Sequence, residues 1–161
     1  MPSDYYMLIS GVNGESQAAD MAKNIELEAW DFDVNSQATV GGNGLSVGRP
    51  WFSDFGFVCK LDTASWQIMK NMCQGTHIAT ATFTGRKTGG DKTPYKFLAI
   101  TLSNAFVTSF QTDGEGTGIP KAKVSLAFEN VQFQYFTQDT KLGTTSLAGT
   151  AKYSIEKVQA G

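Results

Sequence analysis

Apolar residues recur at helical spacing in one bounded stretch of the chain, between Ser53 and Ile78. Asp62 or Thr63 can cap the N-terminus of a helix there, and Gly75 can close it in a left-handed conformation. The spacing therefore predicts one amphipathic helix whose apolar stripe lies on a sheet. That stripe contains Leu61, Ser65, Ile68, Met69, Met72 and Cys73.

Elsewhere, apolar and polar positions alternate with the period of two that is typical of β-strands. Such alternation predicts strands at residues 5–10, 26–35, 79–87, 94–102, 105–112, 122–128, 129–136 and 151–158, with a turn at residues 88–92. We expect about eight strands in total and one helix. Because open strand edges invite uncontrolled pairing, the prediction is an all-β fold: an antiparallel β-barrel of two packed sheets with one flanking α-helix.

A glycine-rich segment, NSQATVGGNGLSVGRPW, runs from Asn35 to Trp51. We interpret this segment as too polar to pack and too long for a tight hairpin, so we expect a loop that projects from the body. Trp51 and Phe52 follow Arg49 at the end of this loop, where they are candidates to anchor a partner.

Composition narrows the possible partners. The 161 residues suit one domain over residues 1–161, and 13 basic against 15 acidic residues give a formal net charge of −2. No basic block can neutralise phosphates or hold an anionic membrane surface, so neither nucleic acid nor membrane is expected as a partner. The opening residues lack the features of a cleaved signal peptide, which predicts synthesis and assembly in the cytoplasm.

Cysteine usage gives no sign of a metal or redox site. Cys59 and Cys73 lack metal-ligand spacing, and we expect both to fill the core as reduced thiols. No cofactor is predicted.

Candidate catalytic residues are few. His77, the sole histidine, has no nearby cysteine or serine elbow, so a structural, hydrogen-bonding role is the better interpretation. Paired acids can serve glycosidases or bind calcium, but a regular strand places Glu26 and Glu28 on the face opposite Asp31 and Asp33. We interpret these acids as a solvated strand face, and we predict no catalytic residue and no metal site.

The glycine clusters at residues 41–44 and 114–118 are not followed by a helix N-terminus. A phosphate cradle needs that helix, so both clusters are interpreted as loops.

Several short motifs follow one another along the chain: Gly14-Glu15-Ser16, Ser36-Gln37, Leu61-Asp62, Gly75-Thr76-His77-Ile78, Arg86-Lys87 with Gly89-Gly90-Asp91, and Val124-Ser125-Leu126. In this order and spacing they resemble the haemolysin-coregulated protein (Hcp) family, the tube subunits of bacterial type VI secretion. The resemblance covers nearly the whole chain, and it departs at the C-terminus, where Ser154-Ile155 follow Tyr153 in place of the usual tryptophan.

The resemblance implies a small barrel that assembles into homo-hexameric rings, which stack into a hollow tube and are exported without a cleaved signal peptide. It implies three further partners, namely a spike protein at the tube tip, a contractile sheath, and small effector proteins in the lumen. By similarity, Asp31 takes a lumen-facing, effector-binding position. The ring-stacking loop would contain Val40, Gly41, Gly42, Asn43, Gly44, Leu45 and Arg49.

Three alternatives remain open at this point. A monomeric β-barrel with a small ligand in its interior would need an apolar cavity. A hydrolase would have to use the acidic strand or His77. A tube protein of a related contractile injector or phage tail would share the fold.

Overall fold

The structure is a computed structural model that describes residues 3–88, 93–139, 145–156 and 159–160. One helix, α1 (Thr63–Gln74), lies in this part of the chain. The strands are β1 (Ser3–Ile9), β2 (Ile25–Asp31), β3 (Val34–Asn35), β4 (Ala38–Gly41), β5 (Gly44–Val47), β6 (Trp51–Phe52), β7 (Phe55–Lys60), β8 (Ile78–Thr88), β9 (Pro94–Asp113), β10 (Lys121–Gln138), β11 (Thr145–Ser154) and β12 (Gln159–Ala160).

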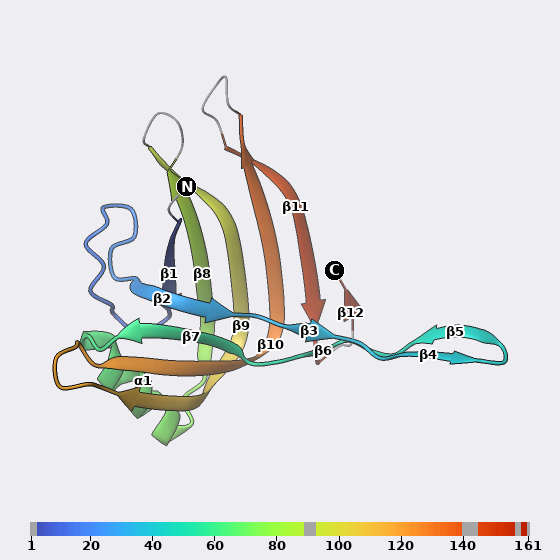
Figure 1. Ribbon diagram of the computed structural model, residues 1–161, viewed down its shortest axis with the longest axis horizontal. Coiled ribbons are helices and arrows are strands. Elements are labelled where there is room, and N and C mark those ends of the chain that lie inside the picture. The colour runs from blue at the N-terminus through green and yellow to red at the C-terminus, as the bar shows by residue number, and fades with distance from the viewer. Residues whose placement is uncertain (1–2, 89–92, 140–144, 157–158, 161) are drawn as a thin grey trace.

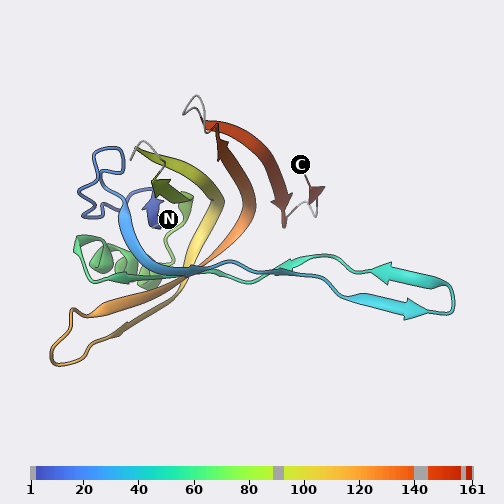
Figure 2. The ribbon, with the colours of Figure 1, turned by 45° about the horizontal axis from the view of Figure 1, so that its top comes forward.

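Six of the described strands close into an antiparallel barrel. Their order is β10-β7-β2-β1-β8-β9, and β9 pairs again with β10 to complete the ring. β11 continues the sheet from the free side of β10, and β12 pairs with the end of β11 (Figure 1). Figure 2 shows the curvature of these strands around the interior, with α1 at one end of the body. The predicted all-β barrel with a flanking helix is confirmed.

The predicted number of about eight strands is wrong, because the described residues form twelve. Short strands such as β4 and β5 were not predicted, and two long strands each cover two predicted ones. Residues 94–102 and 105–112 belong to the single strand β9, and residues 122–128 and 129–136 belong to β10. The alternation of β9 breaks at Asn104, which takes a positive φ of 53°. Asparagine tolerates this conformation, so the strand bends there and continues. Of the turn predicted at residues 88–92, Thr88 ends β8, and residues 89–92 lie outside the described residues.

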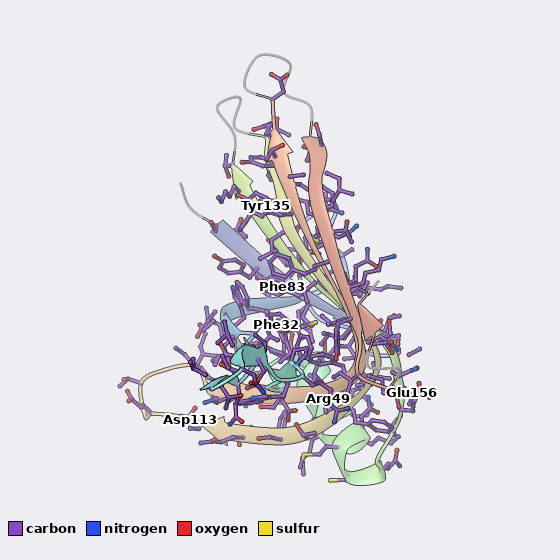
Figure 3. The ribbon with its side chains drawn as sticks, turned by 90° about the vertical axis from the view of Figure 1, so that its right-hand side faces the viewer. Phe32, Arg49, Phe83, Asp113, Tyr135 and Glu156 are labelled. Carbon is purple, nitrogen blue, oxygen red and sulfur yellow. The ribbon has the colours of Figure 1, made fainter. Side chains whose placement is uncertain are left out.

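The interior of the barrel is filled by side chains. Phe55 and Phe83 are fully buried, and the Trp30 ring lies 4.5 Å from the ring of Phe83 between centroids. Figure 3 shows Phe32 and Phe83 among the strands. A packed interior opposes the alternative of a barrel that holds a small ligand inside.

The predicted helix boundaries are confirmed. The Asp62 side chain accepts a hydrogen bond from the Ala64 backbone N–H at 3.0 Å, and the Asp62 N–H donates to Ser65 Oγ at 3.1 Å. These two bonds form a capping box. Gly75 closes the helix with φ 62°.

The predicted apolar stripe of the helix is partly wrong. Ala64, Ser65 and Ile68 are buried on the side that faces the barrel, whereas Met69 is 52% exposed. The remaining predicted members are also exposed: Leu61, Met72 and Cys73. Two adjacent rows of the helix are apolar, and spacing alone does not say which row meets the sheet.

The observed orientation of α1 against the sheet also corrects a prediction about the thiols. Cys59 is buried in β7 as expected, but Cys73 is exposed on α1. Both are free thiols.

The connection between β1 and β2 ties α1 to the barrel. Glu15 Oε1 accepts a hydrogen bond from the Thr63 backbone N–H at 3.2 Å, at the first turn of α1. Gly14 lies so close to the next segment that an added Cβ would come 2.6 Å from the carbonyl carbon of Asn24. The Gly14-Glu15-Ser16 motif therefore combines a close backbone approach with a second cap on the helix.

A buried arginine holds the same connection to the sheet. Arg86 is 6% exposed, and its guanidinium donates to Asp20 Oδ1 and, at 3.1 Å, to the Tyr6 hydroxyl. The ion pair lowers the pKa of the Asp20 carboxyl below its usual value, chiefly through the hydrogen bond from Arg86.

Candidate functional site

The glycine-rich segment projects far from the body as an arm, which we define as residues 34–52 (Figures 1 and 2). Projection was predicted, but the expectation that no tight hairpin forms is wrong. β4 and β5 pair from Ala38 opposite Val47 to Gly41 opposite Gly44, which leaves a two-residue turn between the strands. Gly44 has φ 106°, a conformation that glycine adopts readily.

The two faces of the arm differ in polarity. Val40 pairs with Leu45 on one face, and Ala38 pairs with Val47 two residues along on the same face. Val40 is 84% exposed, Leu45 67% and Val47 65%. On the opposite face the hydroxyls of Thr39 and Ser46 are 2.8 Å apart and hydrogen-bonded. The arm is thus an amphipathic ribbon, and the expectation that this segment is simply polar is wrong.

A shallow pocket lies where the arm joins the body, and we call it the root pocket. Its volume is about 330 Å³, and the Phe52 ring lies 5.3 Å from that of Tyr153 between centroids. Arg49 is the charged residue in its lining, and Trp51 is 54% exposed. The lining residues are Arg49, Pro50, Trp51, Phe52, Tyr153 and Ile155.

A β-bulge decides where Asp31 points. The register of β2 against β7 shifts by one residue at Glu28. Beyond the bulge Trp30 packs into the core and Asp31 is exposed on the outer side, together with Glu26 and Glu28. The prediction that Asp31 faces away from these two glutamates is therefore wrong, because it assumed a regular strand.

Asp31 belongs to an exposed surface that we call the polar face, built by β2, β7, β10 and the second half of β9. Across these strands Asp31 pairs with Gly56, Gly56 with Ser125, and Ser125 with Ser109. A Cβ added to Gly56 would meet the Asp31 carboxylate, with the Asp31 Cγ at 3.1 Å. The carboxylate therefore lies flat over the backbone of Gly56.

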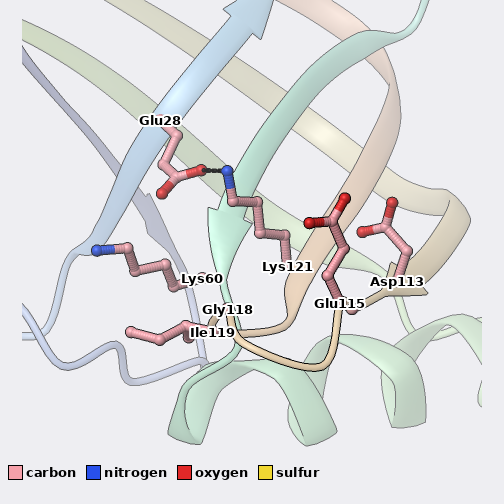
Figure 4. Close-up of a pocket in the computed structure, with 8 residues that line it drawn as sticks. Glu28, Lys60, Asp113, Glu115, Gly118, Ile119 and Lys121 are labelled. Carbon is pink, nitrogen blue, oxygen red and sulfur yellow. Dashed lines mark ion pairs between the residues drawn. The ribbon is translucent and has the colours of Figure 1, made fainter.

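The connection between β9 and β10, residues 113–121, forms a hairpin end that we call the tip. A hollow of about 550 Å³ separates the tip from β2 and β7 (Figure 4). Glu28 and Lys121 form an ion pair of 2.9 Å beside it, and the hydrogen bond that Lys121 donates to the Glu28 carboxylate raises the pKa of Lys121. Figure 4 shows the carboxylates of Asp113 and Glu115 together on one side of the hollow and the Lys60 amine on the other.

The other sequence candidates carry little chemistry. His77 is exposed, and its ring contacts the ring of Phe106 edge-on at 5.2 Å between centroids. Within the described ranges, no three His, Cys, Asp or Glu side chains gather in a way that could hold a metal ion. No helix in the same ranges is long and apolar enough to cross a bilayer.

Sequence reasoning missed three surfaces: the apolar face of the arm, the root pocket and the hollow beside the tip. The arm did leave a signal, because Ala38, Val40, Leu45 and Val47 are placed symmetrically about residues 42–43. The root pocket left a partial signal, because Trp51 and Phe52 were candidates to anchor a partner, but the sequence could not join them to Tyr153 and Ile155 about a hundred positions away.

Comparison with known proteins gives consistent matches. The family model described as "Type VI secretion system effector, Hcp" matches residues 6–135. Protein hcp1 of Pseudomonas aeruginosa is 30% identical over 155 residues, which cover 95% of this chain and 94% of that protein.

Solved structures match the fold along the full length. A structure of a type six secretion system protein superimposes with a TM-score of 0.91 at 23% identity, covering 99% of this chain and 100% of the other. Hcp1 from Salmonella typhimurium superimposes with a TM-score of 0.81 at 24% identity and covers 100% of both chains.

Proposed function

This chain belongs to the Hcp family of type VI secretion proteins, and from that premise we propose that it is a structural subunit of the secretion tube. In this proposal residues 1–161 act as one subunit, six subunits form a ring, and rings stack into a hollow tube that is exported. The family is one of secreted tube proteins and not a known enzyme family.

The observation that carries the proposal is the arm. Two strands of four residues with an exposed apolar face do not form a stable unit alone in water. Contact with another subunit would cover this face and both open strand edges. The segment proposed to reach the adjacent ring contains Val40, Gly41, Gly42, Asn43, Gly44, Leu45 and Arg49.

The polar face is proposed to line the lumen. It presents serines, the exposed lysines Lys121 and Lys123, and the Asp31 carboxylate over Gly56, a surface suited to reversible hydrogen bonds. Small effector proteins would contact it during transport, with Asp31 as an acceptor for their donor groups. The spike protein and contractile sheath are proposed as further partners on the strength of the family alone.

Native mass spectrometry and analytical ultracentrifugation test the ring. The monomer mass is 17.4 kDa, so a ring of six subunits has a mass of about 104 kDa. We expect this species at micromolar concentration, and longer stacks by negative-stain electron microscopy at higher concentration. A protein that stays monomeric at every concentration would contradict the ring.

Effector binding is tested with a defined probe. A basic test peptide, fluorescently labelled, should bind the ring more weakly after Asp31→Asn, because the charged acceptor is lost. Asp33→Asn is the matched control, since it removes an exposed acid outside β2. Equal affinity of the parent and the Asp31 variant would argue against this role of Asp31.

A further inference from the structure

We propose that the root pocket of one subunit receives the tip of the next subunit along the stack. This rests on the proposed function, because it assumes that rings stack, and it names the surfaces that meet. The occupant of the pocket is a second copy of the same chain.

The placement of the two surfaces favours a head-to-tail contact. The tip and the arm lie at opposite ends of the longest axis of the molecule (Figures 1 and 2), and residues 49–52 of the arm line the root pocket. A contact between unlike surfaces at opposite ends repeats in one direction, which is the geometry of an open stack. In that arrangement the arm of the first subunit extends along the side of the second.

The root pocket offers one cation in an apolar setting. Arg49 is the charged lining residue, and Trp51, Tyr153 and Ile155 supply most of the wall. A guanidinium can bind a carboxylate through two parallel hydrogen bonds, and apolar walls exclude water from such a pair.

The tip offers the complementary groups. Asp113 and Glu115 are exposed, and Ile119, 59% exposed, lies on the opposite side of the hollow near Lys60 (Figure 4). Lys121 forms its ion pair with Glu28, and the Lys60 amine lies across the hollow from the two acids. The end of the hairpin therefore presents two carboxylates that form no ion pair with a described residue, on the side of the hollow away from Lys60 and Ile119.

The two surfaces match in charge. The carboxylate of Asp113 or Glu115 would meet Arg49 within the apolar wall that Trp51, Tyr153 and Ile155 form. Charge complementarity of this kind fixes orientation, since two root pockets or two tips brought together would place like charges in contact.

A charge reversal tests the contact. Arg49→Glu should leave the 104 kDa ring intact, about six monomer masses, and raise the concentration needed for stacking at least tenfold. The double variant Asp113→Lys and Glu115→Lys should do the same. Combining all three substitutions should restore stacking in large part, because the pair is reversed and not removed.

Lys70→Glu on the exposed side of α1 is the matched control, since it makes the same charge change away from both surfaces. The measurements are sedimentation velocity for the ring and electron microscopy for stack length. Equal stacking of Arg49→Glu and Lys70→Glu would overturn the inference, and so would a triple variant no better than Arg49→Glu. Loss of the ring from the parent itself would instead count against the proposed function.

Discussion

The apolar face of the arm should matter for assembly and not for folding. The perturbation is the double substitution Val40→Ser and Leu45→Ser, which makes both faces of the ribbon polar. These two side chains face each other across β4 and β5, so the change affects one continuous surface.

The magnitude follows from the exposed fractions of the two side chains. Full burial of a valine or leucine stabilises by about 1.5–3 kcal/mol. At 84% and 67% exposure most of that transfer free energy is still available for assembly, about 1–2.5 kcal/mol for each side chain. Two side chains in each of six subunits would remove about 12–30 kcal/mol from one contact between rings. The free energy of unfolding should change by only about 0.5 kcal/mol.

The assay pairs urea denaturation, followed by circular dichroism, with sedimentation of the native protein. The matched control is Thr39→Ala with Ser46→Ala, which alters the opposite face of the same ribbon. The control should stack like the parent, while the Val40 and Leu45 variant should remain as single rings. Normal stacking of that variant, or a large loss of folding stability, would refute the argument that the arm completes its packing only in the assembly.

Other parts of the fold give sharp expectations. Gly14→Ala should destabilise by about 2–3 kcal/mol in urea denaturation, because the new Cβ meets backbone atoms of Asn24 that cannot move aside; Gly116→Ala, where nothing lies within 4 Å, is the control. One thiol of two should react with a maleimide in the folded protein and both in urea, since burial raises the pKa of Cys59 to about 12 while Cys73 is exposed; equal labelling of both in the native state would contradict the burial. The folded-state pKa of Asp20 is lowered, so its contribution to stability is present at neutral pH and lost as the pH falls below about 4. The stability difference between the parent and Asp20→Asn should therefore be larger at pH 6 than at pH 3 in urea denaturation, and a constant difference would exclude the ion pair as its cause.

Local signals predicted local structure well. Asp62 and Gly75 cap α1 as expected, because the groups involved lie within a few residues of each other. The prediction of an all-β barrel followed from the alternation of apolar and polar residues in many segments.

Features fixed by distant pairing were not predictable in the same way. The bulge at Glu28 exists only against the register of β7, so a single strand could not reveal that Asp31 turns outward. The buried row of α1 is chosen by its contact with β9, and helical spacing placed both Ile68 and Met69 in the apolar stripe. The continuity of β9 through Asn104 depends on pairing to β10 on both sides of the bend.

The arm also affects solubility before assembly. Two open strand edges beside an apolar face are the features that promote aggregation, through pairing with other unfolded or misfolded chains. Strands of four residues with glycine at positions 41, 42 and 44 lower the β-propensity of the segment, and Arg49 adds a charge at its end. The glycines of the arm thus lower the tendency of the free subunit to aggregate.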